Sequence, residues 1–168
     1  MKLKLTTTAI VSAMALSTLA VASQAQAEEP YTTVEGWAIY GETDKLGCIM
    51  ERVVESGLLV RMGKIKETNK FGYLAVYTQD ESVEVYGNVV SNEEAVLDLD
   101  GKRFTGTVVG RIRDGGWRGG SVKANNPDFG TALAKSYVLT LNPEGENPIE
   151  ISLDGTFNAM AETQTCNQ

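Results

Sequence analysis

Residues 149–166, IEISLDGTFNAMAETQTC, decide the fold, and we interpret the rest of the chain from them. At the start of this stretch Ile149, Ile151 and Leu153 alternate with polar residues. Alternation with a period of two is typical of a β-strand that buries one face. The stretch therefore predicts a strand that packs one side against a core.

A turn and a helix follow this strand. Gly155 permits a sharp turn, and Asp154 or Thr156 can cap the next helix. Apolar residues then recur with the spacing of one helix face. That face is predicted to consist of Phe157, Met160 and Ala161.

The chain contains two cysteines, Cys48 and Cys166. In an exported chain a pair of cysteines is typically joined, and this bridge would fasten the terminal helix to the first hairpin. The bridge would close a loop of 118 residues. In the chain-entropy account, a loop of this length adds roughly 5 kcal/mol to the free energy of unfolding by restricting the unfolded state. The alternative is a reactive thiol pair, but neither cysteine belongs to a C-x-x-C motif or has a basic neighbour.

The N-terminus has the three parts of a secretory signal peptide. Lys2 and Lys4 precede an uncharged run over 5–23, and the small residues at 25–27 form an A-x-A cleavage site. Cleavage after Ala27 predicts a periplasmic protein with no membrane span in the mature chain. Removal of residues 1–27 leaves 28–168, a length that suits a single domain.

The mature chain is acidic. The whole chain has 15 basic and 22 acidic residues, and loss of Lys2 and Lys4 gives the mature chain a net charge of −9. Nucleic-acid binding requires a net basic surface, so we expect no nucleic-acid partner.

Short runs with strand character recur along the mature chain, separated by turn residues every eight to twelve positions. This spacing predicts an all-β fold, a single antiparallel β-sandwich or flattened barrel of about 8–10 strands with two short helices. The disulfide would tether the C-terminal helix. We expect 28–33 to be a loose leader and 114–120 (DGGWRGG) to be irregular. Pro127 and Asp128 can start a short helix with Phe129, Ala132 and Leu133 on one side. Strands are expected at 34–40, 48–54, 58–65, 71–78, 83–90, 95–99, 104–112, 137–141 and 149–153.

The composition excludes much catalytic chemistry. The chain contains no histidine, which removes Ser-His and Cys-His nucleophile pairs and histidine-ligated zinc. The mature chain also lacks the phosphate-cradling and dinucleotide-binding glycine motifs. We expect no cofactor and no metal.

Carboxylate chemistry remains open. Two acidic clusters could supply it: one contains Asp98 and Asp100, and the other Asp80, Glu81 and Glu84. A pair of carboxyl groups can cleave a glycosidic bond. The alternative interpretation is that these residues are solvated strand ends that prevent edge-to-edge association.

A basic stretch at 102–123 is the strongest candidate for binding. It contains six basic residues against the single acid Asp114, and Trp117 lies between two glycine pairs. Tryptophan offers a stacking surface, and arginine makes bidentate contacts to carboxylate or phosphate. Alternatively, Trp117 plugs one end of the sandwich while the arginines pair with acids. The predicted binding residues are Arg111, Arg113, Trp117 and Arg118, and the predicted partner is an envelope protein or an anionic small molecule.

Three stretches carry a resemblance to a known family: GWAIYGETDKLGCIM (36–50), ALAKSYVLTL (132–141) and residues 149–166. Together they resemble the periplasmic proteins of the invasion-associated locus B type. The resemblance implies an exported β-sandwich without catalytic residues that acts in envelope stress or host interaction. The positions that match the family pattern are Trp37, Cys48, Leu153 and Gly155.

The sequence thus predicts an exported, non-enzymatic β-domain that binds a partner protein or an anionic ligand. Two alternatives stay open: a carboxylate-dependent hydrolase of envelope polysaccharide, and an inhibitor-like protein that occupies another enzyme's cleft.

Overall fold

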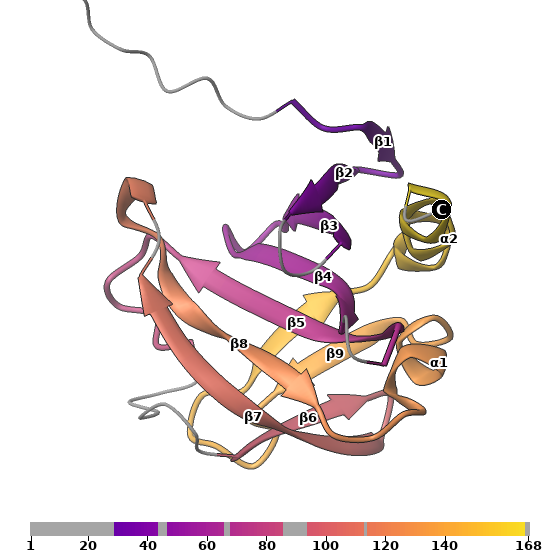
Figure 1. The fold of residues 1–168 in the computed structure, drawn as a ribbon. Coiled ribbons are helices and arrows are strands. Elements are labelled where there is room, and N and C mark those ends of the chain that lie inside the picture. The colour runs from indigo at the N-terminus through magenta and orange to yellow at the C-terminus, as the bar shows by residue number, and fades with distance from the viewer. Residues whose placement is uncertain (1–28, 44–46, 66–67, 86–93, 113, 167–168) are drawn as a thin grey trace, which may run out of the picture.

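The computed structural model describes residues 29–43, 47–65, 68–85, 94–112 and 114–166 (Figure 1). The predicted signal peptide at 1–27 lies outside the described residues. The strands are β1 (Thr32–Val34), β2 (Trp37–Thr43), β3 (Gly47–Val53), β4 (Leu59–Ile65), β5 (Lys70–Thr78), β6 (Glu94–Leu99), β7 (Lys102–Ile112), β8 (Arg118–Ala124), β9 (Val138–Leu141) and β10 (Ile149–Ser152). The helices are α1 (Phe129–Leu133), α2 (Thr156–Cys166) and a short 3-10 turn, η1 (Asp114–Gly116).

The ten strands form one antiparallel sheet in the order β1-β2-β3-β4-β5-β8-β7-β6-β9-β10. The sheet curls strongly, so strands from both halves face a common interior (Figure 1). The fold prediction is therefore confirmed: the protein is all-β, sandwich-like, with two short helices and a tethered C-terminus.

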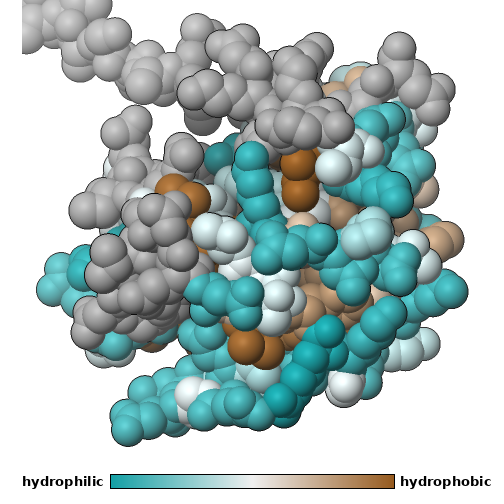
Figure 2. Space-filling view, turned by 60° about the horizontal axis from the view of Figure 1, so that its bottom comes forward, coloured by the Kyte–Doolittle hydropathy of each residue, from teal (hydrophilic) through white to brown (hydrophobic). Residues whose placement is uncertain are grey.

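One apolar core fills the interior of the curled sheet. Trp37 and Ile39 from β2, Val76 from β5, Leu139 from β9 and Ile151 from β10 all belong to it and are almost fully buried. Hydrophilic side chains cover most of the described surface on the face that Figure 2 shows. Neither of the two described α-helices has the length and apolar character needed to cross a bilayer.

The disulfide forms between Cys48 on β3 and Cys166 at the end of α2, as predicted. It joins residues separated by 118 positions. α2 consequently packs against β1, β2 and β3, although it follows β10 at the opposite edge of the sheet.

The predicted face of α2 is correct at Met160 and wrong at the other two positions. Phe157 is 65% exposed and Ala161 is also exposed. The residues buried beside Met160 are Thr156, Ala159 and Thr163. Thr163 can be buried because its hydroxyl donates a hydrogen bond to the Ala159 carbonyl oxygen at 2.7 Å.

The capping prediction for α2 is also wrong. Thr156 is the first helical residue, and its buried hydroxyl has no hydrogen-bond partner among the described residues. Asp154 contributes its backbone oxygen to the fold, accepting hydrogen bonds from Trp37 and Arg52. The turn itself occurs at Gly155, with φ of 75°, where an added Cβ would lie 2.6 Å from Cβ of Glu35.

Two further predictions are corrected at the strand level. The expected loose leader contributes β1, because Glu35 and Gly36 both adopt positive φ and form a tight two-residue turn into β2. The strand expected at 83–90 is absent over 83–85, which are irregular, and residues 86–90 lie outside the described residues.

Reduction of the disulfide should lower the free energy of unfolding by about 3 to 5 kcal/mol, because the reduced unfolded chain regains the entropy that the 118-residue loop removes. Urea unfolding with and without dithiothreitol measures this loss. Cys166→Ala is the control: it should unfold like the reduced protein and be insensitive to the reductant. An unchanged midpoint after verified reduction would contradict the expectation.

Candidate functional site

Trp117, the central residue of the predicted site, is half-buried and packs against the sheet. It contacts a small cluster formed by Leu59, Ala75 and Tyr77, which is separate from the main core. This arrangement is closer to the alternative interpretation, in which the ring has a packing role.

Arg118 forms an ion pair with Glu81, with Nη2 2.8 Å from Oε1. Arg111 lies on β7 opposite Gly119, but the structure does not describe its side chain. Arg113 lies outside the described residues. Trp117 thus lies directly before β8, and Arg118 is the first residue of that strand. Their binding role stays a prediction.

The DGGWRGG motif is only partly irregular, which corrects the prediction for 114–120. β8 begins at Arg118, and Gly119 pairs with Tyr77 of β5. An added Cβ at Gly119 would lie 2.1 Å from the carbonyl oxygen of Val76. The second glycine pair of the motif therefore permits close strand packing, and the positive φ of 77° at Gly115 and Gly116 makes the turn before it.

The Asp98 and Asp100 carboxylates bind backbone amides. Asp98 accepts a hydrogen bond from the Gly101 amide at 2.7 Å, which closes the D-G turn. Asp100 accepts from the amides of Tyr137 and Val138 at 2.8 and 3.2 Å, which fixes the start of β9. These hydrogen bonds give both carboxylates a structural role.

Asp80 has a similar role in the other acidic cluster. Its carboxylate accepts hydrogen bonds from the hydroxyl and the amide of Ser82, at 2.7 and 2.8 Å. These hydrogen bonds hold the pKa of Asp80 below its ordinary value, because they favour the charged form. Asp80 thereby shapes the turn that presents Glu81 and Glu84.

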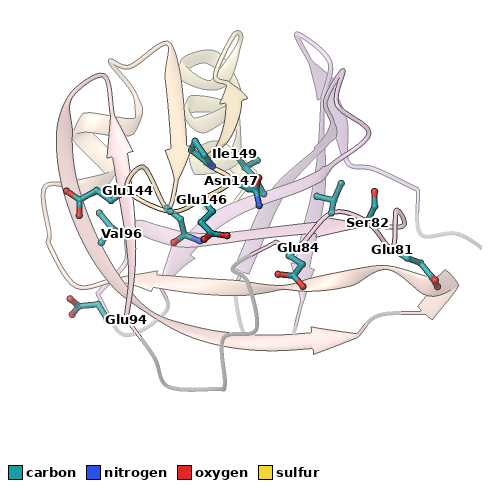
Figure 3. Close-up of a pocket in the computed structure, with 13 residues that line it drawn as sticks. Glu81, Ser82, Glu84, Glu94, Val96, Glu144, Glu146, Asn147 and Ile149 are labelled. Atoms are coloured by element: carbon teal, nitrogen blue, oxygen red, sulfur yellow. The ribbon is translucent and has the colours of Figure 1, made fainter.

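A hollow bordered by described residues lies beside this turn, and we call it the acidic hollow (Figure 3). Its volume is about 710 Å³. Its walls come from the turn after β5, from β6 and from the loop between β9 and β10. The carboxylates that line it are Glu81, Glu84, Glu94, Glu144 and Glu146.

No lysine or arginine is among the described residues that line the acidic hollow. Two of its glutamates have basic partners outside the lining: Arg118 pairs with Glu81, and Arg103 pairs with Glu144 at 2.5 Å. Glu84, Glu94 and Glu146 have no ion pair with a described residue. The hollow therefore keeps an excess of negative charge.

Apolar side chains lie between these carboxylates. Val83, Val96 and Ile149 are half-buried and line the hollow, and Val83 and Ile149 also pack against the core. In the view of Figure 3 the lining residues spread from Glu144 and Glu94 at one end to Glu81 at the other. The site is thus elongated, with acidic groups separated by apolar surface.

This arrangement suits an organic cation better than a metal ion. No group of three or more acidic or cysteine side chains in the described part of the chain is arranged to hold a metal. The volume is in the range of small-ligand sites, roughly 300 to 1,000 Å³. A ligand with several positive charges on hydrocarbon stems would match both kinds of lining.

The sequence analysis considered Glu81 and Glu84 as possible catalysts or as solvated strand ends, and it missed Glu94, Glu144 and Glu146. Each acid lies in a polar segment that resembles an ordinary loop or strand end. The available signal was the excess of acidic over basic residues in the mature chain, which does not say where the acids converge.

Comparison of the chain with protein-family models, with curated proteins and with solved structures found no significant match. The resemblance to the invasion-associated locus B type therefore stays a prediction.

Gly119→Ala should lower the free energy of unfolding by about 3 kcal/mol or more, since its Cβ would collide with the β5 backbone. Gly116→Ala is the matched control in the same motif. A Cβ added at Gly116 would meet no atom within 4 Å, so this substitution should lower the free energy of unfolding by about 1 kcal/mol, because of the positive φ alone. Chemical denaturation compares the two, and equal losses would show that the motif does not serve strand packing.

Proposed function

We propose that the mature chain is an exported, non-catalytic recognition domain that binds an organic polycation in the acidic hollow. The observation that carries the proposal is the described lining of this hollow, in which five glutamates are separated by apolar side chains and no described lining residue is basic. The proposal changes the sign of the ligand expected from the sequence, from an anion to a cation.

The chemistry of the lining favours ammonium or guanidinium groups that are spaced along a chain. Such groups pair with separate carboxylates, while the methylene segments between them cover apolar surface. Val83, Val96 and Ile149 offer that surface. A compact divalent ion would gain little from carboxylates that do not converge.

The contacts of the basic stretch favour a cation over an anion. Arg103 and Arg118 both face glutamates of the hollow rim, so an anion beside Arg103 would also meet the carboxylate of Glu144, and one beside Arg118 would meet that of Glu81. Asp98 and Asp100 accept backbone hydrogen bonds, so this pair lends no support to the carboxylate-dependent hydrolase.

Export is part of the proposal. It is supported by the three-part N-terminal pattern and by the disulfide, which persists in oxidising compartments such as the periplasm. A function in envelope stress or host interaction would follow from the family resemblance.

Replacing the three glutamates that have no ion pair with a described residue (Glu84→Gln, Glu94→Gln and Glu146→Gln together) should weaken binding of spermine about tenfold, because each lost charge pair contributes a fraction of a kcal/mol. Isothermal titration calorimetry at low ionic strength measures the affinity. Raising the salt concentration should weaken binding to the unaltered protein.

The control removes the same charge elsewhere: Glu29→Gln, Glu55→Gln and Asp128→Asn together, all exposed and outside the hollow. Equal loss in both triple variants would mean that spermine responds to net charge alone and that the hollow is not a site. Absence of spermine binding to the unaltered protein would refute the proposal outright.

A further inference from the structure

β10 is an outer strand of the sheet. Within the described chain it pairs with β9 on one side only, in the register Ile149↔Leu141 and Ile151↔Leu139. The Leu153 amide continues this pattern and donates to the Tyr137 carbonyl oxygen at 2.9 Å. Backbone groups alternate in direction along a strand, so those of Glu150 and Ser152 point away from β9.

These outward groups form a short template for another strand. Glu150 and Ser152 are exposed, and their two amides and two carbonyls can form hydrogen bonds with an added extended segment. The template contains no proline, and its regular pairing with β9 holds it in strand geometry.

The two ends of β10 differ. Beyond its C-terminal end, the Asp154 carbonyl oxygen accepts hydrogen bonds from Trp37 Nε1 at 3.1 Å and Arg52 Nη1 at 2.9 Å, which join this point to β2 and β3. At the N-terminal end Ile149 is both the first residue of β10 and part of the wall of the acidic hollow. A segment that pairs with β10 would therefore continue into the acidic hollow.

We propose that the ligand of this protein is an extended basic peptide segment of a partner, which pairs with β10 through its backbone and places lysine or arginine side chains in the acidic hollow. The inference rests on the proposed function and narrows its ligand class. Side chains of an added strand alternate between faces, so basic residues at every second position would all reach the same face.

Charge complementarity selects this occupant over a second copy of the chain. A two-fold β10–β10 pairing would bring Glu150 of one copy near Glu150 of the other and place two acidic hollows together. Like charges across paired strands are destabilising. The net charge of the mature chain adds to this repulsion.

The test uses the oxidised mature protein and the acetylated, amidated peptide KVKVKVK. Two N-methylated forms of the peptide carry the methyl groups either on all valine amides or on all lysine amides. Only one edge of the peptide can pair with β10, so one form should lose about tenfold in affinity. The other should stay within about twofold of the parent, and fluorescence anisotropy of labelled peptide measures all three.

A protein variant tests the same contact from the other side. Glu150→Pro removes an outward amide without touching the pairing with β9, a position at which edge strands tolerate proline. It should weaken KVKVKVK about tenfold and leave spermine binding at the level of Glu150→Gln, the matched charge control. In the unaltered protein, hydrogen exchange should slow at the Glu150 and Ser152 amides when the peptide binds.

The outcomes separate the two proposals. The strand pairing is overturned if both N-methylated peptides bind with equal affinity and hydrogen exchange at the Glu150 and Ser152 amides does not change. If spermine still binds in that case, the cation site stays intact. If neither spermine nor KVKVKVK binds to the unaltered protein, the cation site and the strand pairing are both overturned. A protein dimer held through β10, detected by sedimentation velocity and abolished by Glu150→Pro, would make a second copy the occupant instead.

Discussion

The carbonyl oxygen of Asp154 is the point on which the architecture depends. It accepts hydrogen bonds from Trp37 and Arg52, residues more than 100 positions earlier in the chain. The Cys48–Cys166 disulfide fastens the helix that follows to the same hairpin. Because the β2–β3 hairpin near one edge of the sheet and the segment after β10 at the other edge are held together at this corner, the sheet must curl, and its curvature creates both the core and the hollow at the opposite end of β10.

The parts of the fold that could be predicted from sequence are those with local causes. The alternation at Ile149 and Ile151, the turn at Gly155 and the cysteine pair all follow from neighbouring residues or from compartment chemistry. The buried face of α2 could not be predicted from hydrophobicity. Thr163 satisfies its hydroxyl within the helix and packs inward, which leaves Phe157 exposed.

The candidate site was missed for the opposite reason, because its causes are non-local. The glycines of DGGWRGG suggested an open binding loop, yet Gly119 is required by the approach of the Val76 carbonyl oxygen. Glu84, Glu94 and Glu146 come from three segments that meet only after β6 has paired with β7 and β9. No spacing in the chain encodes that meeting.

The ion pairs at the rim explain how an acidic hollow can coexist with a basic stretch. The side chains of Arg103 and Glu144 are 56% and 72% exposed, and those of Arg118 and Glu81 are 42% and 84% exposed. Pairs this exposed contribute little to stability and are screened by salt. Under the proposed function, a ligand cation would replace either arginine at small cost, so these pairs would reduce self-repulsion in the free protein and leave all five carboxylates available on binding.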